Sequence, residues 1–275
     1  MRKILYILII FIIIGIQHSV IAKENIKYIN NVDITSFNIK KYFNIYERNV
    51  NVDFVDDKSI LLMNNTNNAL SLLYFKKPLT SPFGIEIKFD FLISGTGEGI
   101  YLIVGNYTKI VNNIDRATSE GIPLIFYENN SKLYKIESFV HMIDVYKNDY
   151  DYDAPQIKNI PVTNPNDGFT YSASNIKNYL SGCHIIATTI SDVRNKNADF
   201  YGKIDYSKGL YNYKFISNVG AVETSGNLEL KSIDATIIDD IDKFLFGFGA
   251  SSGTVTAQII VSNITIFIYR ATTTL

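Results

Sequence analysis

The sequence predicts an all-β protein made of about ten or more mostly antiparallel strands. Between residues 83 and 93 apolar side chains occupy every second position, a period that fits a strand and not a helix. Other apolar segments of strand length are separated by turns rich in Gly and Asn, such as residues 64–68 (NNTNN) and 94–99 (SGTGEG). Because no repeat and no long helical pattern interrupts them, the strands are expected to share one core.

Composition bounds the size and the class of the protein. Of 275 residues, 47% are hydrophobic and 19% are charged, which is enough to bury one large core in a single domain. The formal net charge is −1 and there is no basic stripe, which argues against nucleic acid as a partner. Cys183 is the only cysteine and has no internal disulfide partner, and its apolar neighbours predict a buried thiol.

Residues 1–22 have the pattern of a secretory signal peptide. A short basic start precedes an apolar stretch at residues 4–16, and residues 20–22 (VIA) fit a cleavage site after Ala22. The apolar stretch is short for a spanning helix, which needs about 20 residues, although an uncleaved signal anchor is the alternative. No later stretch is long enough to cross a bilayer. We therefore expect one domain at residues 23–275, secreted or in the lumen of the secretory pathway.

The first half of the domain reads as a series of short strands. Residues 23–57 have an irregular pattern with scattered aromatic side chains, as expected of one or two edge strands. A hairpin is predicted within residues 132–146, after a turn at residues 128–131. The other strands predicted here are residues 59–63, 69–75, 83–93, 100–104 and 122–127.

The second half begins with an acidic, Pro-containing segment at residues 148–168, which predicts a long surface loop. This loop is either a solvated lid or, with Tyr150, Tyr152 and Tyr171, part of a binding face. The remaining expected elements are strands at residues 185–190, a hairpin at residues 199–216, a short strand near residues 228–230 and one helical turn within residues 234–243.

The closing segment, residues 244–268, is the part around which the rest is organised. It reads as a strand, a loop of five small residues at 249–253, and a last strand. Because residues 258–269 are apolar on both parities, they predict a central strand covered on both sides. Sequons at Asn64, Asn106 and Asn129 make the chain a candidate glycoprotein, whereas the sequon at Asn263 lies in this strand, where a glycan would hardly fit.

These segments resemble L-type (legume-like) lectins. The closing FGFGASSGTVTAQIIVSNITIFI is similar to the family's small-residue loop and terminal strand. Residues 83–103 are similar to its long strand, glycine loop and following strand, and residues 121–130 and 199–216 fall in the expected order. Over residues 59–269 the resemblance implies a concanavalin A-like jelly-roll sandwich of two antiparallel sheets.

The resemblance also implies carbohydrate binding through loops at one rim. Glu98 stands where the family has a sugar-binding Asp, with one methylene more. The implied sugar-binding residues are Glu98, Gly99, Asn130, Ser251, Ser252 and Gly253. Calcium is the implied cofactor, with Glu128, Asn130 and Asp144 as ligands and Asn129 or Asp149 as further oxygen donors. The alternative is that Glu98 is a solvated loop charge and residues 249–253 are only a turn.

No enzyme is expected. Asp240 and Asp242 have alternate spacing, but the Glu-x-Asp-x-x-Glu strand of glucanases with this fold is absent, as is Trp. His141 and His184 lack the company of a hydrolytic triad and are expected to be hydrogen-bonded strand residues. The expected partners are glycans or glycoproteins, and a homodimer stays open. The competing hypothesis is a non-sugar-binding adhesion or structural module.

Overall fold

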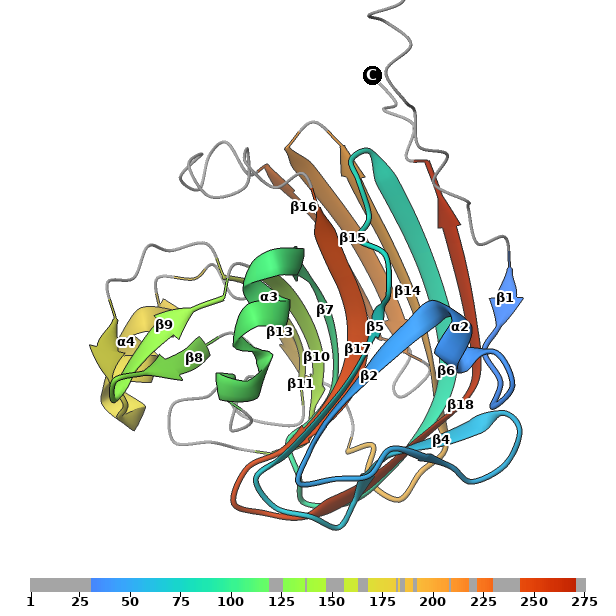
Figure 1. The fold of residues 1–275 in the computed structure, drawn as a ribbon, viewed down its shortest axis with the longest axis horizontal. Helices are drawn as coiled ribbons and strands as arrows, with labels where there is room; N and C mark the ends of the chain where they lie inside the picture. Colours follow the sequence, from blue (N-terminus) through green and yellow to red (C-terminus); the bar gives the residue numbers. More distant parts are fainter. Residues whose placement is uncertain are drawn as a thin grey trace, which may run out of the picture.

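The computed structural model describes residues 31–118, 126–136, 138–146, 156–162, 168–181, 183, 186–189, 192–207, 209–217, 222–229 and 243–270. Two large antiparallel sheets face one another, and a small third sheet lies outside them (Figure 1). The predicted all-β sandwich is therefore confirmed. The predicted signal peptide, residues 1–22, lies outside the described residues.

Sheet A has eight strands, and its outer face is half-exposed. Along the sheet the order is β16 (Val222–Glu229), β15 (Leu210–Ser217), β14 (Ala198–Ser207), β6 (Phe83–Gly95), β18 (Ala257–Tyr269), β4 (Ser59–Asn64) and β3 (Asp53–Phe54), and β1 (Val32–Asp33) pairs with β18. Strands β14 and β15 form the hairpin that was predicted at residues 199–216.

Sheet B has seven strands and packs one face against sheet A. Its order is β13 (Ile186–Thr189), β11 (Gln156–Val162), β10 (Ser138–Asp144), β7 (Gly99–Asn106), β17 (Phe244–Ser252), β5 (Ala69–Phe75) and β2 (Phe43–Arg48). The third sheet, sheet C, consists of β12 (Phe169–Thr170), β9 (Lys132–Lys135) and β8 (Phe126–Asn129).

The main core lies between sheets A and B and is rich in phenylalanine. The alternation predicted from residues 83–93 is confirmed, because the odd-numbered residues of β6 point into this core and are buried. Phe248 of sheet B meets Phe89 of sheet A with ring centroids 6.4 Å apart, and meets Phe43 edge-on at 5.8 Å. Such aromatic pairs add to the area that they bury and fix how the two sheets face one another.

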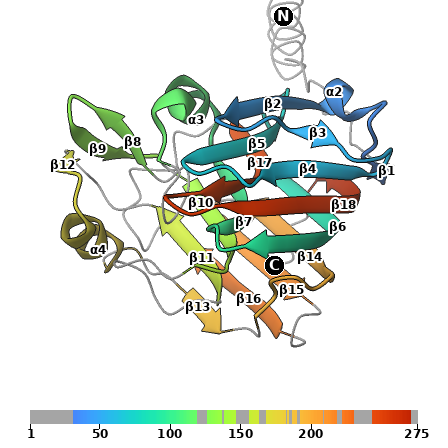
Figure 2. The same ribbon diagram turned by 90° about the horizontal axis from the view of Figure 1, so that it is seen from below.

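A second core covers the opposite face of sheet B. Tyr101, Ile103 and Met142 on this face pack with apolar residues of sheet C and of the helices. Those helices are α3 (Tyr107–Asn113), the 3₁₀ turn η1 (Ile114–Arg116) and α4 (Ala173–Ser181), whereas the single turn α2 (Ile39–Tyr42) precedes β2. Figures 1 and 2 show α3, sheet C and α4 on the side of sheet B that is remote from sheet A. Sheet B is therefore covered on both faces over much of its area.

The closing segment forms two strands, as predicted, but they belong to different sheets. Strand β17 lies in sheet B and is the strand covered on both sides, since all nine of its residues are buried. Strand β18 lies in sheet A, and its residues alternate between buried and half-exposed. The prediction that residues 258–269 are covered on both sides is thus wrong.

A β-bulge explains why β18 is apolar on both parities. The pairing with β6 shifts between Ser262 and Thr265, and Asn263 adopts a left-handed φ of 52°. Ile259 and Val261 point into the core before the bulge, and even-numbered residues take over after it. Asn263 itself is exposed and donates a hydrogen bond to Asp90 Oδ2 at 2.6 Å, so its predicted concealment within the sheet is also wrong.

Two further expectations are corrected by the sheet pairing. Residues 132–146 are not a hairpin, because β9 belongs to sheet C and β10 to sheet B. The surface loop predicted at residues 148–168 contains strand β11, which pairs with β10 along its full length. Among the described residues, β13 pairs with Gln156–Asn159 of β11.

Helices α3 and α4 were not predicted. Asn106 caps α3 by accepting a hydrogen bond from the Lys109 N–H at 3.1 Å, and Ile176 and Leu180, four residues apart, bury one face of α4. None of the helices that the structure describes is long and apolar enough to span a membrane. The buried thiol expected at Cys183 is confirmed.

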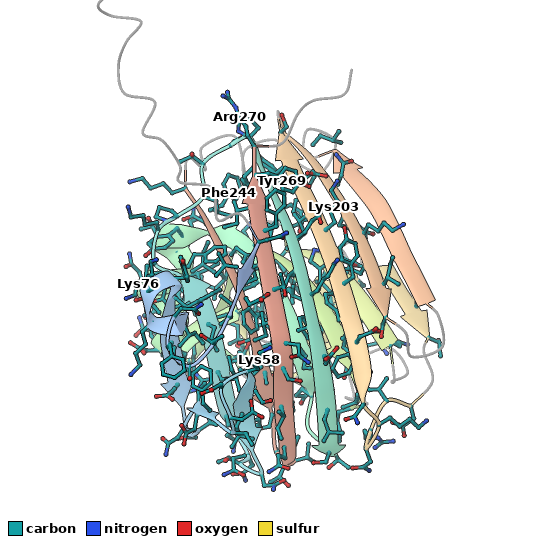
Figure 3. All side chains as sticks on the ribbon, turned by 90° about the vertical axis from the view of Figure 1, so that its right-hand side faces the viewer. Lys58, Lys76, Lys203, Phe244, Tyr269 and Arg270 are labelled. Carbon is teal, nitrogen blue, oxygen red and sulfur yellow. The ribbon has the colours of Figure 1, made fainter. Side chains whose placement is uncertain are left out.

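Near the end of β18, side chains on the outer face of sheet A contact one another. Lys203 and Tyr269 lie close together there although β6 runs between their strands (Figure 3). Gly84 of β6 makes this possible, because a Cβ at that position would lie 2.3 Å from the Tyr269 ring. The ring crosses β6, its hydroxyl donates to Asp205 Oδ1 at 2.7 Å, and the Lys203 ammonium lies 5.5 Å from its centroid.

Candidate functional site

Four neighbouring strands of sheet B, β17, β7, β10 and β11, place one polar or glycine residue each in a row at one rim of the sheet, which we call the rim row. Ser251 pairs with Gly99, Gly99 with Asp144, and Asp144 with Gln156. Side chains of directly paired residues point to the same face of a sheet. That face is the one remote from sheet A, because residues of the same parity on β7 and β10, such as Tyr101 and Met142, belong to the second core.

The two glycine-bearing loops implicated by the sequence meet at this rim. Gly99 pairs with Ser251, and the Thr96 N–H donates to the Thr256 carbonyl at 2.9 Å, so the loop before β7 touches the connection from β17 to β18. The loop before β7 also contacts β10, since the Val145 N–H donates to the Glu98 carbonyl at 3.0 Å. Segments far apart in sequence therefore build one continuous rim.

Glycine is needed at position 99 for two reasons. Its φ is 137°, a conformation that residues with a Cβ rarely adopt. A Cβ there would also lie 2.0 Å from the Ile143 carbonyl oxygen of β10. Gly99 thus lets β7 and β10 approach closely at the point where Glu98 precedes the strand.

Glu98 is buried, with a relative exposure of 0%. The alternative interpretation of Glu98 as a solvated loop charge is therefore wrong. A fully buried carboxyl group is unusual away from functional or ion-paired positions, because the charged form loses its hydration. Its place directly before Gly99 puts this acid at the rim row.

Ser251 and Ser252, which were predicted to lie in a small-residue loop, instead end strand β17, and they have different roles. Ser252 belongs to the fold, because its hydroxyl donates to the Thr66 carbonyl at 2.5 Å and accepts from the Ala69 N–H at 3.2 Å. The Gly253 carbonyl likewise accepts from the Asn68 N–H at 2.6 Å. Ser251 instead faces the row, is fully buried, and its Oγ has no hydrogen-bond partner in the part of the chain that the structure describes.

A buried ion pair completes the row. The Lys158 ammonium lies 2.6 Å from Asp144 Oδ2, and both side chains are fully buried. Asp144 Oδ1 accepts a hydrogen bond from the Tyr146 N–H at 2.9 Å. Gln156 beside it is 6% exposed, and its Oε1 lacks a hydrogen-bond partner among the described residues. Sequence reasoning missed Lys158 and Gln156 because it assigned them to a loop.

The structure does not bring the expected calcium ligands together. Glu128 is exposed on β8 and Asn130 occupies the β8–β9 turn with a φ of 51°, both in sheet C, whereas Asp144 is in sheet B. In Figures 1 and 2 the β8–β9 hairpin lies outside the two large sheets. Asn130, which was also predicted to bind sugar, therefore lies outside the rim row.

Calcium requires six to eight oxygen ligands, several of them carboxylates. The carboxylate of Asp144 already has a cation beside it, the Lys158 ammonium, and also accepts a hydrogen bond from the Tyr146 N–H. Within the described ranges no group of three or more His, Cys, Asp or Glu side chains is placed to hold a metal ion. The residues that the structure describes do not fit a calcium site.

His141 lies between the two large sheets, away from the rim row. Its Nε2 is 2.7 Å from the Tyr211 hydroxyl and its Nδ1 is 2.7 Å from Asn159 Oδ1. Burial lowers the pKa of His141 to about 3, against the smaller opposing effect of the Asn159 hydrogen bond. The expectation that His141 is a hydrogen-bonded strand residue is confirmed.

Comparison with known proteins shows the fold. No family model matches the chain, and no curated protein matches it. Winged bean acidic lectin, solved with methyl-α-D-galactose, has a TM-score of 0.59 at 12% identity, covering 86% of this chain and 96% of that lectin. The exoplasmic/lumenal domain of VIP36, in a Ca²⁺/Man3GlcNAc-bound form, has a TM-score of 0.56 at 14% identity, covering 90% of each chain. Peanut lectin has a TM-score of 0.55 at 13% identity, covering 86% and 95%. The chain has the concanavalin A-like sandwich fold of L-type lectins.

Proposed function

We propose that this chain is a carbohydrate-binding protein whose site is the rim row of sheet B, with Glu98 and Gly99 at its centre. The observation that carries the proposal is the pair of buried oxygens at Ser251 Oγ and Gln156 Oε1, neither of which has a partner among the described residues. Leaving a buried polar atom unpaired costs about 1 to 3 kcal/mol, so native proteins satisfy nearly all of them.

Sugar hydroxyl groups suit these positions chemically. A hydroxyl donates to the carboxylate of Glu98 or to the amide oxygen of Gln156, and it both donates to and accepts from the Ser251 hydroxyl. A small number of polar groups among mostly apolar side chains is the usual composition of a small-ligand site.

The sequence supports the setting in which such a protein would act. The signal-peptide pattern of residues 1–22 favours secretion or residence in the lumen of the secretory pathway, where glycoproteins are the natural source of glycans. We propose glycoprotein glycans as the ligands and assign no catalytic step to the site. The chain is also a candidate glycoprotein itself, and a homodimer is compatible with the proposal.

A glycan array tests the proposal, run with excess Ca²⁺ and again with EDTA because VIP36 was solved with both Ca²⁺ and a glycan. Binding to a defined set of glycans in at least one condition supports it. No binding to any glycan in either condition would leave the adhesion or structural module as the better hypothesis.

Variants locate the site. Glu98→Gln and Ser251→Ala should each weaken binding by about 10-fold or more, the loss expected for one hydrogen bond to a charged or buried group. Two controls are matched to them: Glu128→Gln changes an exposed carboxylate in sheet C, and Ser252→Ala removes the neighbouring hydroxyl, which is used within the fold. Unchanged affinity in Glu98→Gln would remove Glu98 from the site.

A further inference from the structure

Lys158 and Asp144 form a fully buried charge pair. Their N–O distance is 2.6 Å and neither side chain is exposed. Removing two charges from water is expensive, and a hydrophobic pair of similar volume is often as stable. A buried ion pair is therefore weak evidence for a stabilising role. It can instead serve to position neighbouring segments of the chain.

Contacts connect this pair to the loop of Glu98. Asp144 Oδ1 accepts from the Tyr146 N–H at 2.9 Å, which shapes the chain as it leaves β10. One residue earlier, the Val145 N–H donates to the Glu98 carbonyl at 3.0 Å. Asp144 also pairs directly with Gly99. The carboxylate of Asp144 thus stabilises the turn at Val145 and Tyr146, and Val145 in that turn is hydrogen-bonded to the Glu98 backbone.

A carboxylate in such a position needs a positive charge nearby. The VIP36 domain, which has a similar fold, was solved in a Ca²⁺-bound form. Here Lys158 lies on the strand next to β10, opposite Met142, and its ammonium meets Asp144 Oδ2 on the same face of sheet B. The charge of Asp144 is thus compensated by a side chain of this chain, and the Lys158 ammonium occupies the position beside the carboxylate that a cation would take.

We propose that Lys158 replaces a metal ion at the rim. Its ammonium fixes Asp144, and through Asp144 the Glu98–Gly99 backbone, so that the site is formed without a divalent cation. Lys158 is a positioning residue and does not touch the ligand. The part of this inference that concerns glycan affinity rests on the proposed carbohydrate site, whereas the part that concerns metal independence does not.

Thermal unfolding of the unmodified mature protein tests metal independence without any knowledge of the sugar. Samples are treated with EDTA and then melted in EDTA, in Ca²⁺ or in Mn²⁺. We expect melting temperatures that agree within about 1 °C, because an ion that does not bind the native state cannot stabilise it. A rise of about 5 °C or more in Ca²⁺ would overturn the inference, and it would show that ligands outside the described residues complete a calcium site.

Three variants test the ion pair: Lys158→Met, Asp144→Leu, which also removes the acceptor for the Tyr146 N–H, and the double variant. Each single variant should melt well below the unmodified protein, because it leaves one buried charge uncompensated. The double variant, which has neither charge, should recover at least about half of that loss. A double variant no more stable than Lys158→Met would contradict the pairing.

Glycan affinity separates positioning from mere stability. The double variant should fold yet bind glycans about 10-fold more weakly in EDTA, because neither charge holds the turn at Val145 and Tyr146. Affinity equal to that of the unmodified protein would contradict the positioning role. If the unmodified protein binds no glycan at all, the proposed function fails, while the melting experiments still decide whether Lys158 replaces a metal.

Discussion

Acidification should destabilise this protein through His141. The ring is fully buried between the two large sheets, with its Nε2 toward the Tyr211 hydroxyl and its Nδ1 toward Asn159 Oδ1. A neutral ring satisfies both contacts when Nδ1–H donates to Asn159 and the Tyr211 hydroxyl donates to Nε2. The other groups packed on it are the rings of Tyr213 and Phe215, and no carboxylate touches it among the described residues. Protonation would therefore place an uncompensated charge in the core.

The size of the effect follows from the lowered pKa. The pKa of His141 is about 3 in the folded protein, against about 6.5 in an unfolded chain. Between these values the unfolded state binds one more proton than the folded state, so stability rises with pH and is lost as the pH falls below 6.5. Each pH unit in this window corresponds to about 1.4 kcal/mol, which gives about 2 kcal/mol between pH 6.5 and pH 5.

Urea unfolding at pH 7.5 and pH 5 measures this loss in the unmodified protein and in His141→Gln, which keeps a neutral polar side chain. Other titrating groups contribute equally to both proteins and cancel in the comparison. The unmodified protein should lose about 2 kcal/mol more than the variant over this interval. If both lose the same free energy of unfolding, the assignment of His141 as a buried neutral ring is refuted.

Two further predictions concern the rim. Gly99→Ala should lower the free energy of unfolding by about 2 kcal/mol or more, because it adds a Cβ at a positive φ and 2.0 Å from the Ile143 carbonyl oxygen; urea unfolding equal to that of the unmodified protein would contradict this. Ser252→Ala should cost about 1 to 3 kcal/mol, because it leaves the buried Ala69 N–H and the partly buried Thr66 carbonyl without this partner, whereas Ser251→Ala should cost less than about 0.5 kcal/mol while weakening glycan binding. Equal unfolding free energies for the two serine variants would contradict this division of tasks.

The sequence alone determined several of the strands, with β4, β5 and β6 close to their observed boundaries. The alternation at residues 83–93 defines β6 because side chains on a strand point to opposite faces, and this is a property of the local backbone. The same argument found the β14–β15 hairpin, and the loop at residues 94–99 was recognisable because Gly95 and Gly99 adopt positive φ angles that favour glycine. Helix α4 had a signal, Ile176 and Leu180 four residues apart, but one pair is too short a pattern to identify a helix.

Only the tertiary structure decided how these strands are used. The bulge at Asn263 reverses the parity of β18, so a strand covered on one side reads in sequence as covered on both. Lys158 stands 14 residues after Asp144, in a stretch whose prolines and acids predict a loop, and nothing local indicates that its ammonium meets that carboxylate. Glu128 and Asn130 look like calcium ligands by position but lie in another sheet. The alternation of side chains along a strand depends on neighbouring residues. Strand order and charge pairing depend instead on segments that are distant in sequence and meet only when the sheets assemble.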